Sequence, residues 1–249
     1  MSEGRKVAVV GANGRMGTAV CQAVTTSEDL HLVGRYDLGD DIASVRGADV
    51  VVEFSVPGAS FDNVLACLEA GADVVVGTTG WDGARLKTLE ERLAAYPERG
   101  VLIAPNFAIG ALLMMSFARQ AARFYESAEI IELHHPEKVD APSGTATRTA
   151  SLIAAARAEA GLPAVPDATV TDPRGARGAD VDGIHVHGVR LRGLVAHQEV
   201  LFGAAGEGLT IRHDSYDRGS FMPGVLAAVR AIGSRPGLTV GLEHVLGIA

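Results

Sequence analysis

Short apolar runs alternate with longer amphipathic stretches over the first half of the chain. The runs are Val-rich, apolar on both faces and bounded by Gly, Asp or Pro, as buried parallel strands are. The stretches between them place apolar residues at helical spacing. This alternation predicts an α/β unit with a doubly wound parallel sheet. The expected strands are 6–10, 30–36, 49–54, 73–76 and 101–104, and the expected helices are 15–26, 60–70 and 82–95.

The pattern changes after about residue 106. A long helical stretch comes first, with Met114, Met115 and Phe117 expected on its core face. A strand, a second helix and a loop rich in Pro, Gly and Asp follow. Ser143 stands where the second helix needs an N-cap, and Gly161 lies just past its end. The expected spans are 108–125 (helix), 128–134 (strand), 143–160 (helix) and 162–183 (surface loop).

Three further strands alternate polar and apolar positions, which is typical of an antiparallel or mixed sheet with one outward face. In a regular strand Ile184 and Val186 would point to one face of the sheet, whereas Val189 and Leu191 would point to the other. A β-bulge is therefore predicted at Gly188, where the phase changes. These strands are expected at 184–192, 196–202 and 208–213, before a helix at 221–232 and a strand at 238–242.

Composition narrows the class of protein. The 249 residues include 22 Lys and Arg against 30 Asp and Glu, a formal net charge of −8. Because nucleic-acid and anionic-membrane binding rest on positive charge, neither partner is expected. The apolar run Val7–Val10 is too short for a signal peptide or a membrane span, and Cys21 and Cys67 show no CxxC spacing. A cytoplasmic location is expected.

A glycine-rich turn follows the first strand. Gly11, Gly14 and Gly17 have the spacing GxxGxxG, which allows a tight turn, a close approach to a pyrophosphate and close helix packing, in that order. The helix that follows offers N–H groups and a partial positive charge to phosphates. The alternative is a turn that binds nothing. The predicted cofactor residues here are Gly11, Ala12, Asn13, Gly14, Arg15 and Met16.

Asp37 stands twenty residues beyond Gly17, where an acid that binds the adenosine ribose hydroxyls is expected. Leu38 provides no basic group for a 2′-phosphate, which favours NADH. Arg15 can reach such a phosphate, which leaves NADPH open. The predicted cofactor is therefore NADH or NADPH, bound by a Rossmann-like domain.

The C-terminal helix and strand continue the alternation of helices and strands predicted for the first half of the chain, rather than the order of elements predicted for the second half. We therefore expect a dinucleotide-binding domain of residues 1–106 and 218–249, and an α+β domain of residues 107–217 for substrate binding and oligomerisation.

Two later loops follow predicted parallel strands at their carboxyl ends, where such sheets bind ligands. Small side chains and hydroxyls in them can line a nicotinamide, although plain turn formation explains the same residues. They are Gly77, Thr78 and Thr79 after one strand, and Ala104, Pro105, Asn106 and Phe107 after the next.

The densest polar segment runs from Glu132 to Ala146. Two prolines stiffen it, and the helix start at Ser143 can bind a carboxylate. Lys138 is one of only 3 Lys against 19 Arg in the chain. Lys can release its proton near physiological pH, whereas Arg cannot. The presence of Lys rather than Arg at position 138 therefore favours a role for this side chain as a proton donor.

Two other interpretations of this segment stay open. His134, His135, Glu137 and Asp140 are candidate metal ligands, but neighbouring histidines on a strand point apart and no third spaced ligand follows, so no metal is expected. The polar groups can also serve only for capping and surface pairing.

The stretch HHPEKVDAPSGTA, His134–Ala146, resembles the characteristic segment of the dihydrodipicolinate reductase family, in the wording of its actinobacterial members. The resemblance continues at residues 9–17, 76–80, 104–107 and 218–221, so it covers essentially the whole chain.

The resemblance implies NAD(P)H-dependent reduction of 4-hydroxy-tetrahydrodipicolinate, a cyclic imine with two carboxylates, in diaminopimelate and lysine biosynthesis. It implies His134 as the acid/base candidate, Lys138 as the proton donor, and a homotetramer built through the sheet of the second domain. It places Arg218 near the cofactor. The implied substrate-binding residues are His135, Ser143, Gly144, Thr145 and Thr79.

Two competing functions are weighed. Another small-substrate Rossmann dehydrogenase, of the aspartate or homoserine type, has no need of a helix start with Ser-Gly-Thr beside a His–Lys pair. A nonenzymatic NAD(P)-sensing regulator needs only residues 11–37 and leaves the polar segment without a role.

Other polar residues of the predicted second domain have simpler expected roles. His185, His187 and His197 are expected to point outward from the sheet, at a subunit contact. Arg190 and Arg192 are expected to form ion pairs or to be solvated.

Overall fold

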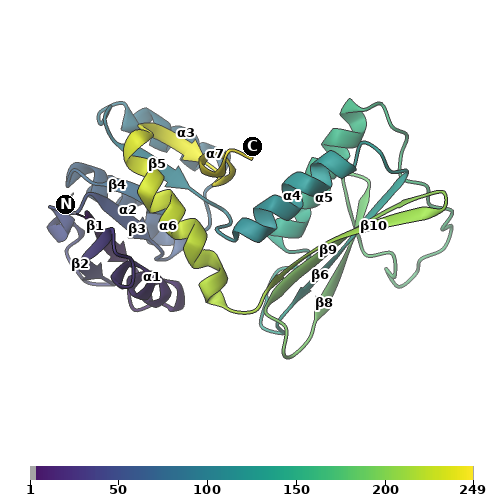
Figure 1. Ribbon diagram of the computed structural model, residues 1–249, viewed down its shortest axis with the longest axis horizontal. Helices are drawn as coiled ribbons and strands as arrows, with labels where there is room; N and C mark the ends of the chain where they lie inside the picture. The colour runs from purple at the N-terminus through teal and green to yellow at the C-terminus, as the bar shows by residue number, and fades with distance from the viewer. Residues whose placement is uncertain (1–3, 249) are drawn as a thin grey trace. The chain divides into compact units, whose positions relative to one another are not determined.

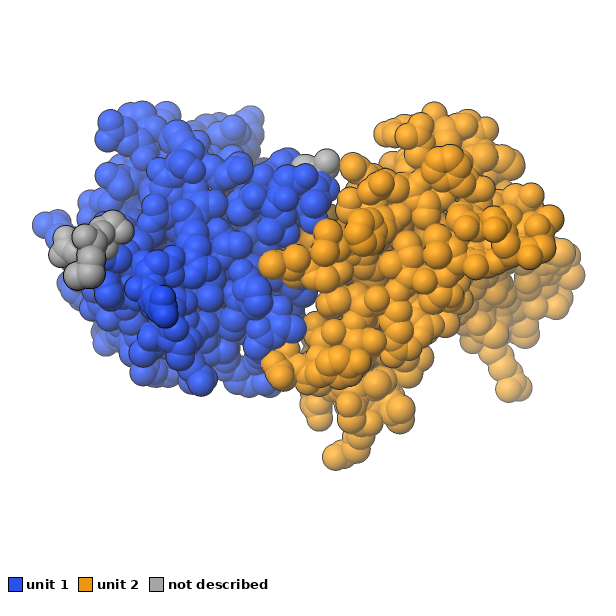
Figure 2. All heavy atoms as spheres, in the orientation of Figure 1, with its two compact units in different colours: residues 1–108, 218–249 blue, residues 109–217 orange. Residues whose placement is uncertain are grey.

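The structure is a computed structural model that describes residues 4–248. The chain forms two compact units, drawn in different colours in Figure 2. Unit 1 consists of residues 1–108 and 218–249, and unit 2 consists of residues 109–217. The C-terminal segment thus returns to the unit in which the chain begins.

Unit 1 contains a six-stranded sheet in the order β11-β5-β4-β3-β1-β2, in which all neighbouring strands are parallel. This confirms the predicted doubly wound parallel sheet. The strand order reverses at β1, because β2 lies on one side of it and β3 on the other, and such sheets bind ligands at that point. The strands are β1 Arg5–Val10, β2 Leu30–Tyr36, β3 Val50–Glu53, β4 Asp73–Val76, β5 Gly100–Ile103 and β11 Gly237–Val240.

Helices cover both faces of this sheet (Figure 1). On one face α1 packs against α6, and on the other α2 and α3 pack against the strands. Its α-helices are α1 Arg15–Thr25, α2 Pro57–Glu69, α3 Gly83–Leu93, α6 Met222–Ala231 and α7 Glu243–Leu246, and its 3₁₀ helices are Ile42–Val45, Arg218–Phe221 and Ile232–Ser234.

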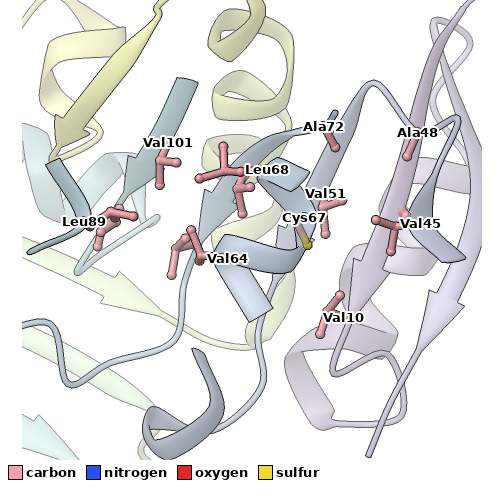
Figure 3. Packing of buried hydrophobic residues seen from close by; sticks show 14 of the residues in the cluster. Val10, Val45, Ala48, Val51, Val64, Cys67, Leu68, Ala72, Leu89 and Val101 are labelled. Atoms are coloured by element: carbon pink, nitrogen blue, oxygen red, sulfur yellow. The ribbon is translucent and has the colours of Figure 1, made fainter. Parts of the chain in front are cut away.

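The core under α2 and α3 is built from small and branched side chains. Figure 3 shows Val10, Val51 and Val101 of the strands facing Leu68 of α2 and Leu89 of α3. All five are at most 2% exposed. Consecutive strand residues point to opposite faces, so the Val-rich runs supply apolar side chains to both layers of helices.

Both cysteines of the chain lie in helices of unit 1. Cys21 in α1 and Cys67 in α2 are buried free thiols. Burial raises the pKa of Cys67 to about 12, and the nearby Glu53 carboxyl adds to the effect. Neither thiol has the character of a nucleophile.

Unit 2 contains a mixed five-stranded sheet in the order β10-β9-β6-β8-β7, with β6 and β8 parallel and the other pairs antiparallel. Helices α4 and α5 lie side by side against one face of it (Figure 1). The mixed sheet that the alternation predicted is confirmed. The elements are α4 Ile109–Ala121, β6 Ser127–His134, α5 Gly144–Glu159, β7 Ala179–Val181, β8 Ile184–Arg190, β9 Ala196–Ala204 and β10 Glu207–Ser215.

The predicted β-bulge at Gly188 is wrong. The pairing of β6 with β8 runs without a shift from Glu129–His185 to His134–Arg190, with Gly188 opposite Glu132. The glycine instead leaves space for the side chain of Glu132, because a Cβ at position 188 would lie 3.2 Å from Glu132 Oε1. The apolar phase changes because the helix-facing positions of β8 become polar near its end.

Three smaller differences concern single elements. Helix α2 begins at Pro57 rather than at residue 60, because proline suits the first helical position. Helix α4 ends at Ala121, and Phe117 is 50% exposed rather than in the core. The loop expected at 162–183 contains the short strand β7 at the sheet edge.

No helix within residues 4–248 has the length and apolarity needed to cross a bilayer.

Candidate functional site

The glycine-rich turn joins β1 to α1 where the strand order of unit 1 reverses. Gly11 has a φ of +78°, which favours glycine, and a Cβ on it would lie 2.3 Å from Phe54 O. A Cβ on Gly17 would lie 2.0 Å from Gly11 O, so α1 packs directly on the turn. These two glycines have the packing roles that their spacing predicted.

The N-terminus of α1 has no side-chain cap. Gly14 is its N-cap residue, and the first turn contains no acidic residue. Asn13, Gly14 and Arg15 are exposed. Since the first N–H groups of a helix need acceptors from outside it, this end of α1 fits a dinucleotide pyrophosphate.

Asp37 follows β2 and lies beside the same turn. Its carboxylate accepts hydrogen bonds from Asn13 N at 2.7 Å and from Leu38 N at 2.8 Å. The bonds from Leu38 and Asn13 hold the pKa of Asp37 below its usual value, so the group is ionised at neutral pH. An ionised carboxylate only accepts hydrogen bonds and therefore suits the hydroxyl donors of a ribose.

The loops after β3, β4 and β5 contribute a packed aromatic pair and a buried hydroxyl. The rings of Phe54 and Phe107 lie 5.7 Å apart, and a Cβ on Gly77 would strike the Phe54 ring. Thr78 is 7% exposed, and its Oγ1 has no hydrogen-bond partner among residues 4–248. A buried hydroxyl without a partner is costly, and a polar group of a bound cofactor can supply the missing bond.

The remaining residues predicted to bind the cofactor differ in exposure. Ala12 and Ala104 are buried, so only their backbone groups are candidates for a ligand contact. Asn106 is half-buried and accepts a hydrogen bond from Ala108 N at 2.8 Å. Met16 is half-buried, and Thr79, Pro105 and Arg218 are exposed.

In unit 2, strand β6 ends at His134, and a loop leads from it to α5. Ser143 is the N-cap residue of α5, and its hydroxyl accepts a hydrogen bond from Ala146 N at 3.2 Å, as predicted. Because Ser143 is 2% exposed, its side chain is committed to the cap. Gly144 is exposed and Thr145 is half-buried at the first turn.

His134 contacts a buried ion pair. Its Nδ1 lies 2.5 Å from Oε2 of Glu132, which is fully buried. Arg190 donates to both oxygens of Glu132, at 2.8 and 2.7 Å. Burial lowers the pKa of His134, Glu132 opposes this, and the charges of Lys138 and Arg190 reinforce it, so the pKa lies below its ordinary value. His134 is therefore neutral at pH 7.

Lys138 forms an ion pair with Asp140, on the loop that leads to α5. The hydrogen bond from Lys138 is the main reason why the pKa of Asp140 lies below its usual value. Lys138 therefore already binds a carboxylate, and that carboxylate is the protein's own Asp140.

The four candidate metal ligands form three separate pairs, and two of the candidates pair with each other. His134 pairs with Glu132, Asp140 pairs with Lys138, and His135 Nδ1 lies 3.1 Å from Glu137. Residues 4–248 contain no group of three or more His, Cys, Asp or Glu side chains placed to hold a metal ion.

The three histidines on β8 and β9 differ in their burial and in their acidic partners. His187 and His185 are half-buried and pair with Glu129 and Asp167. His197 lies opposite Leu133 in the pairing of β6 with β9, on the sheet face away from α5 as expected, but it is only 6% exposed and pairs with Asp214 at 2.7 Å.

Sequence reasoning considered Asp140 only as a candidate metal ligand, and it gave Glu132 and Arg190 no functional role. Arg190 was expected to pair, which it does, but its partner lies 58 positions away and no spacing rule identifies it. One signal was present in the sequence. Glu132 and His134 are two residues apart on a strand and so share a face.

Comparison with known proteins gives one consistent family. The family model described as "Dihydrodipicolinate reductase, N-terminus" matches residues 5–107, and that for its C-terminus matches residues 110–246. The chain is 64% identical to the 4-hydroxy-tetrahydrodipicolinate reductase of Cutibacterium acnes over 243 residues, which cover 98% of this chain and 99% of that protein. It is 60% identical to the enzyme of the same name from Nocardia farcinica, over 98% and 99% of the two chains.

Solved structures agree. The dipicolinate-bound dihydrodipicolinate reductase from Paenisporosarcina sp. TG-14 superposes with a TM-score of 0.84 at 36% identity, covering 97% of this chain and 99% of that one. An engineered D-amino acid dehydrogenase bound to NADP⁺ gives a TM-score of 0.56 at 16% identity over 98% and 96% of the chains, a likeness of fold alone.

Proposed function

Since the chain belongs to the dihydrodipicolinate reductase family, we propose that it reduces 4-hydroxy-tetrahydrodipicolinate to tetrahydrodipicolinate in diaminopimelate and lysine biosynthesis. The family match decides for this reaction over an aspartate- or homoserine-type dehydrogenase and over a regulator that only senses NAD(P). One NAD(P)H and one proton are consumed per turnover, and water and NAD(P)⁺ are released.

A nicotinamide cofactor is implied by the family and supplies the hydride when bound. We propose that the uncapped start of α1 binds its pyrophosphate and that Asp37 binds the adenosine ribose. The Thr78 hydroxyl, buried without a partner among the described residues, is proposed to meet the nicotinamide end. The other proposed cofactor residues are Gly11, Ala12, Asn13, Arg15, Met16, Gly77, Thr79, Ala104, Pro105, Asn106, Phe107 and Arg218.

The observation that carries the substrate proposal is the Asp140 carboxylate that Lys138 holds close to the start of α5. Because Lys138 and the start of α5 can hold a carboxylate of the substrate, we propose that the substrate displaces Asp140 from Lys138. The further proposed substrate contacts are His135, Ser143, Thr145 and Thr79, with Ser143 acting through the cap that it forms.

We propose Lys138 as the proton donor. The ammonium group of Lys138 carries a proton that it can release. His134 is neutral at pH 7 and therefore carries no additional proton to donate. His134 is accordingly proposed to accept a hydrogen bond or a proton beside Lys138.

Assembly and location are further parts of the proposal. The sheet face of unit 2 opposite α4 and α5 carries half-buried Ile131, Leu133 and Leu201, and a self-complementary contact in a homotetramer would cover them. A cytoplasmic location fits two buried free thiols. Light scattering tests the assembly, with a mass four times the 25.8 kDa of the chain expected.

The reaction is tested by generating the substrate in place with a dihydrodipicolinate synthase and following the absorbance of NADH or NADPH. Oxidation that needs both enzymes is expected. Absence of oxidation with either cofactor, in a protein that still binds NADH in a titration, would refute the reductase function. The ratio of the two rates assigns the preferred cofactor.

A further inference from the structure

Glu132 is a fully buried carboxylate with no role in the function proposed above. It lies on β6, two residues before His134 on the same face of the strand. Strand β6 runs between β9 and β8 in the sheet of unit 2 (Figure 1). Glu132 is therefore held by strand pairing on both sides, unlike the loop that carries Lys138.

Each oxygen of Glu132 accepts two hydrogen bonds. Oε2 lies 2.5 Å from His134 Nδ1 and 2.8 Å from one Arg190 nitrogen. Oε1 lies 2.7 Å from the other Arg190 nitrogen and 3.3 Å from Ser143 N. A carboxylate only accepts and a guanidinium only donates, so the ring nitrogen that faces Oε2 must carry a hydrogen.

Glu132 is ionised in this arrangement. Burial alone would raise its pKa, but the hydrogen bonds from Arg190 and His134 outweigh burial and hold the pKa below its usual value. Since His134 is neutral, its single ring hydrogen lies on Nδ1, and Nε2 carries the lone pair.

We propose that Glu132 is a positioning residue that holds His134 as the Nδ1–H tautomer, so that Nε2 is a hydrogen-bond acceptor; this inference rests on the proposed reductase function. A histidine fixed in this way cannot donate a proton from Nε2. The tautomer thus leaves Lys138 as the donor and gives His134 the task of accepting a bond from the ammonium or the substrate.

Arg190 links this pair to the loop that carries Lys138. Its second nitrogen also donates to the backbone oxygen of Asp140 at 2.7 Å, and the Asp140 carboxylate binds Lys138. Gly188, opposite Glu132 on β8, leaves the space that the carboxylate occupies. The charged groups acting on His134 are Glu132 from β6, Arg190 from β8 and Lys138 from the loop.

The first test reads the tautomer directly in the wild-type protein. ¹⁵N-histidine labelling and long-range ¹H–¹⁵N correlation distinguish the two ring nitrogens, and comparison with His134→Gln assigns the signals. At pH 7 we expect His134 Nδ1 protonated and Nε2 unprotonated. Protonation at Nε2 would overturn the proposal without any change to Glu132.

The second test is Glu132→Gln. Glutamine keeps the shape of the side chain, but its amide replaces one of the two acceptor oxygens by a donor, which then faces other donors. We expect kcat to fall on the order of 10²-fold with KM within about threefold. Because Glu132 raises the pKa of His134, its loss moves any limb of the pH–rate profile that His134 causes to lower pH. Circular dichroism and thermal melting show whether the variant folds.

A double-mutant cycle separates positioning from a general structural effect. In a His134→Gln background, Glu132→Gln should lower kcat by less than about threefold, since its target is already gone. A loss as large as in the wild-type background would overturn the proposal.

Glu129→Gln is the matched control, because Glu129 lies on the opposite face of the same strand and also pairs with a histidine and an arginine. Its kcat should stay within about threefold of wild type, and an equal loss would argue against a specific role of Glu132. If the wild type oxidises no cofactor with the substrate, the reductase function fails, while the tautomer measurement still decides this proposal.

Discussion

The Asp140 carboxylate binds Lys138, the proposed proton donor. An acidic side chain thus occupies the place proposed for a substrate carboxylate. If the substrate binds as proposed, Asp140 competes with it for Lys138.

Asp140→Asn should lower the KM for the substrate. The change removes a competing charge and its repulsion of the incoming dicarboxylate, and a half-exposed ion pair of this kind is worth up to about 1 kcal/mol, or roughly fivefold. Initial rates at varied substrate concentration measure it, with Glu137→Gln as the control for a general loss of negative charge from the loop. A raised KM in Asp140→Asn would show that Asp140 holds Lys138 in place rather than competing.

Lys138→Arg should abolish most turnover while keeping the charge. Arginine can bind the carboxylate but cannot release a proton at neutral pH, so kcat should fall about 10²- to 10⁴-fold with little change in KM. Steady-state kinetics and an NADH titration test this together, because cofactor affinity should match that of wild type. Near-normal kcat in the arginine variant would remove Lys138 as the donor.

Gly188→Ala should displace the Glu132 carboxylate. The added Cβ would lie 3.2 Å from Glu132 Oε1, closer than an ordinary contact, so the carboxylate must move by a few tenths of an ångström. We expect kcat to fall by less than in Glu132→Gln. Gly203→Ala is the matched control, because Gly203 lies on β9, on the other side of β6, and its added Cβ would make only an ordinary contact, 3.9 Å from Ser127 Cβ. Equal rates for wild type and Gly188→Ala would mean that the cluster tolerates the shift.

Leu38→Arg should shift the cofactor preference toward NADPH. Leu38 is 99% exposed directly after Asp37, so a guanidinium there has room to bind a 2′-phosphate. The ratio of kcat/KM for NADPH over that for NADH should rise about tenfold or more. Leu38→Gln is the uncharged control and should leave the ratio near that of wild type. An unchanged ratio in the arginine variant would mean that the phosphate lies elsewhere.

The fold could be predicted from the sequence because its signals are local. Val-rich strands, the glycine turn and the Ser143 cap each follow from residues within one element, and each is observed. Gly188 was misinterpreted because a glycine that makes space for another strand's side chain looks the same in sequence as one that makes a bulge.

The support of the candidate site was not predictable in the same way. Arg190 reaches Glu132 through the parallel pairing of β6 with β8, and nothing near Arg190 in sequence shows which carboxylate it meets. Asp140 was noticed only as a possible metal ligand, since its contact with Lys138 depends on how the loop folds back on itself.

The buried cysteines have a practical consequence for experiments on this protein. With Cys21 and Cys67 inside helices and the pKa of Cys67 near 12, maleimide dyes at neutral pH have no reactive native thiol to label. A single cysteine introduced at an exposed position, such as Val139, would then carry the fluorophore alone. The natural sequence can therefore serve as its own background for single-site labelling of the Lys138 loop, without first removing any cysteine.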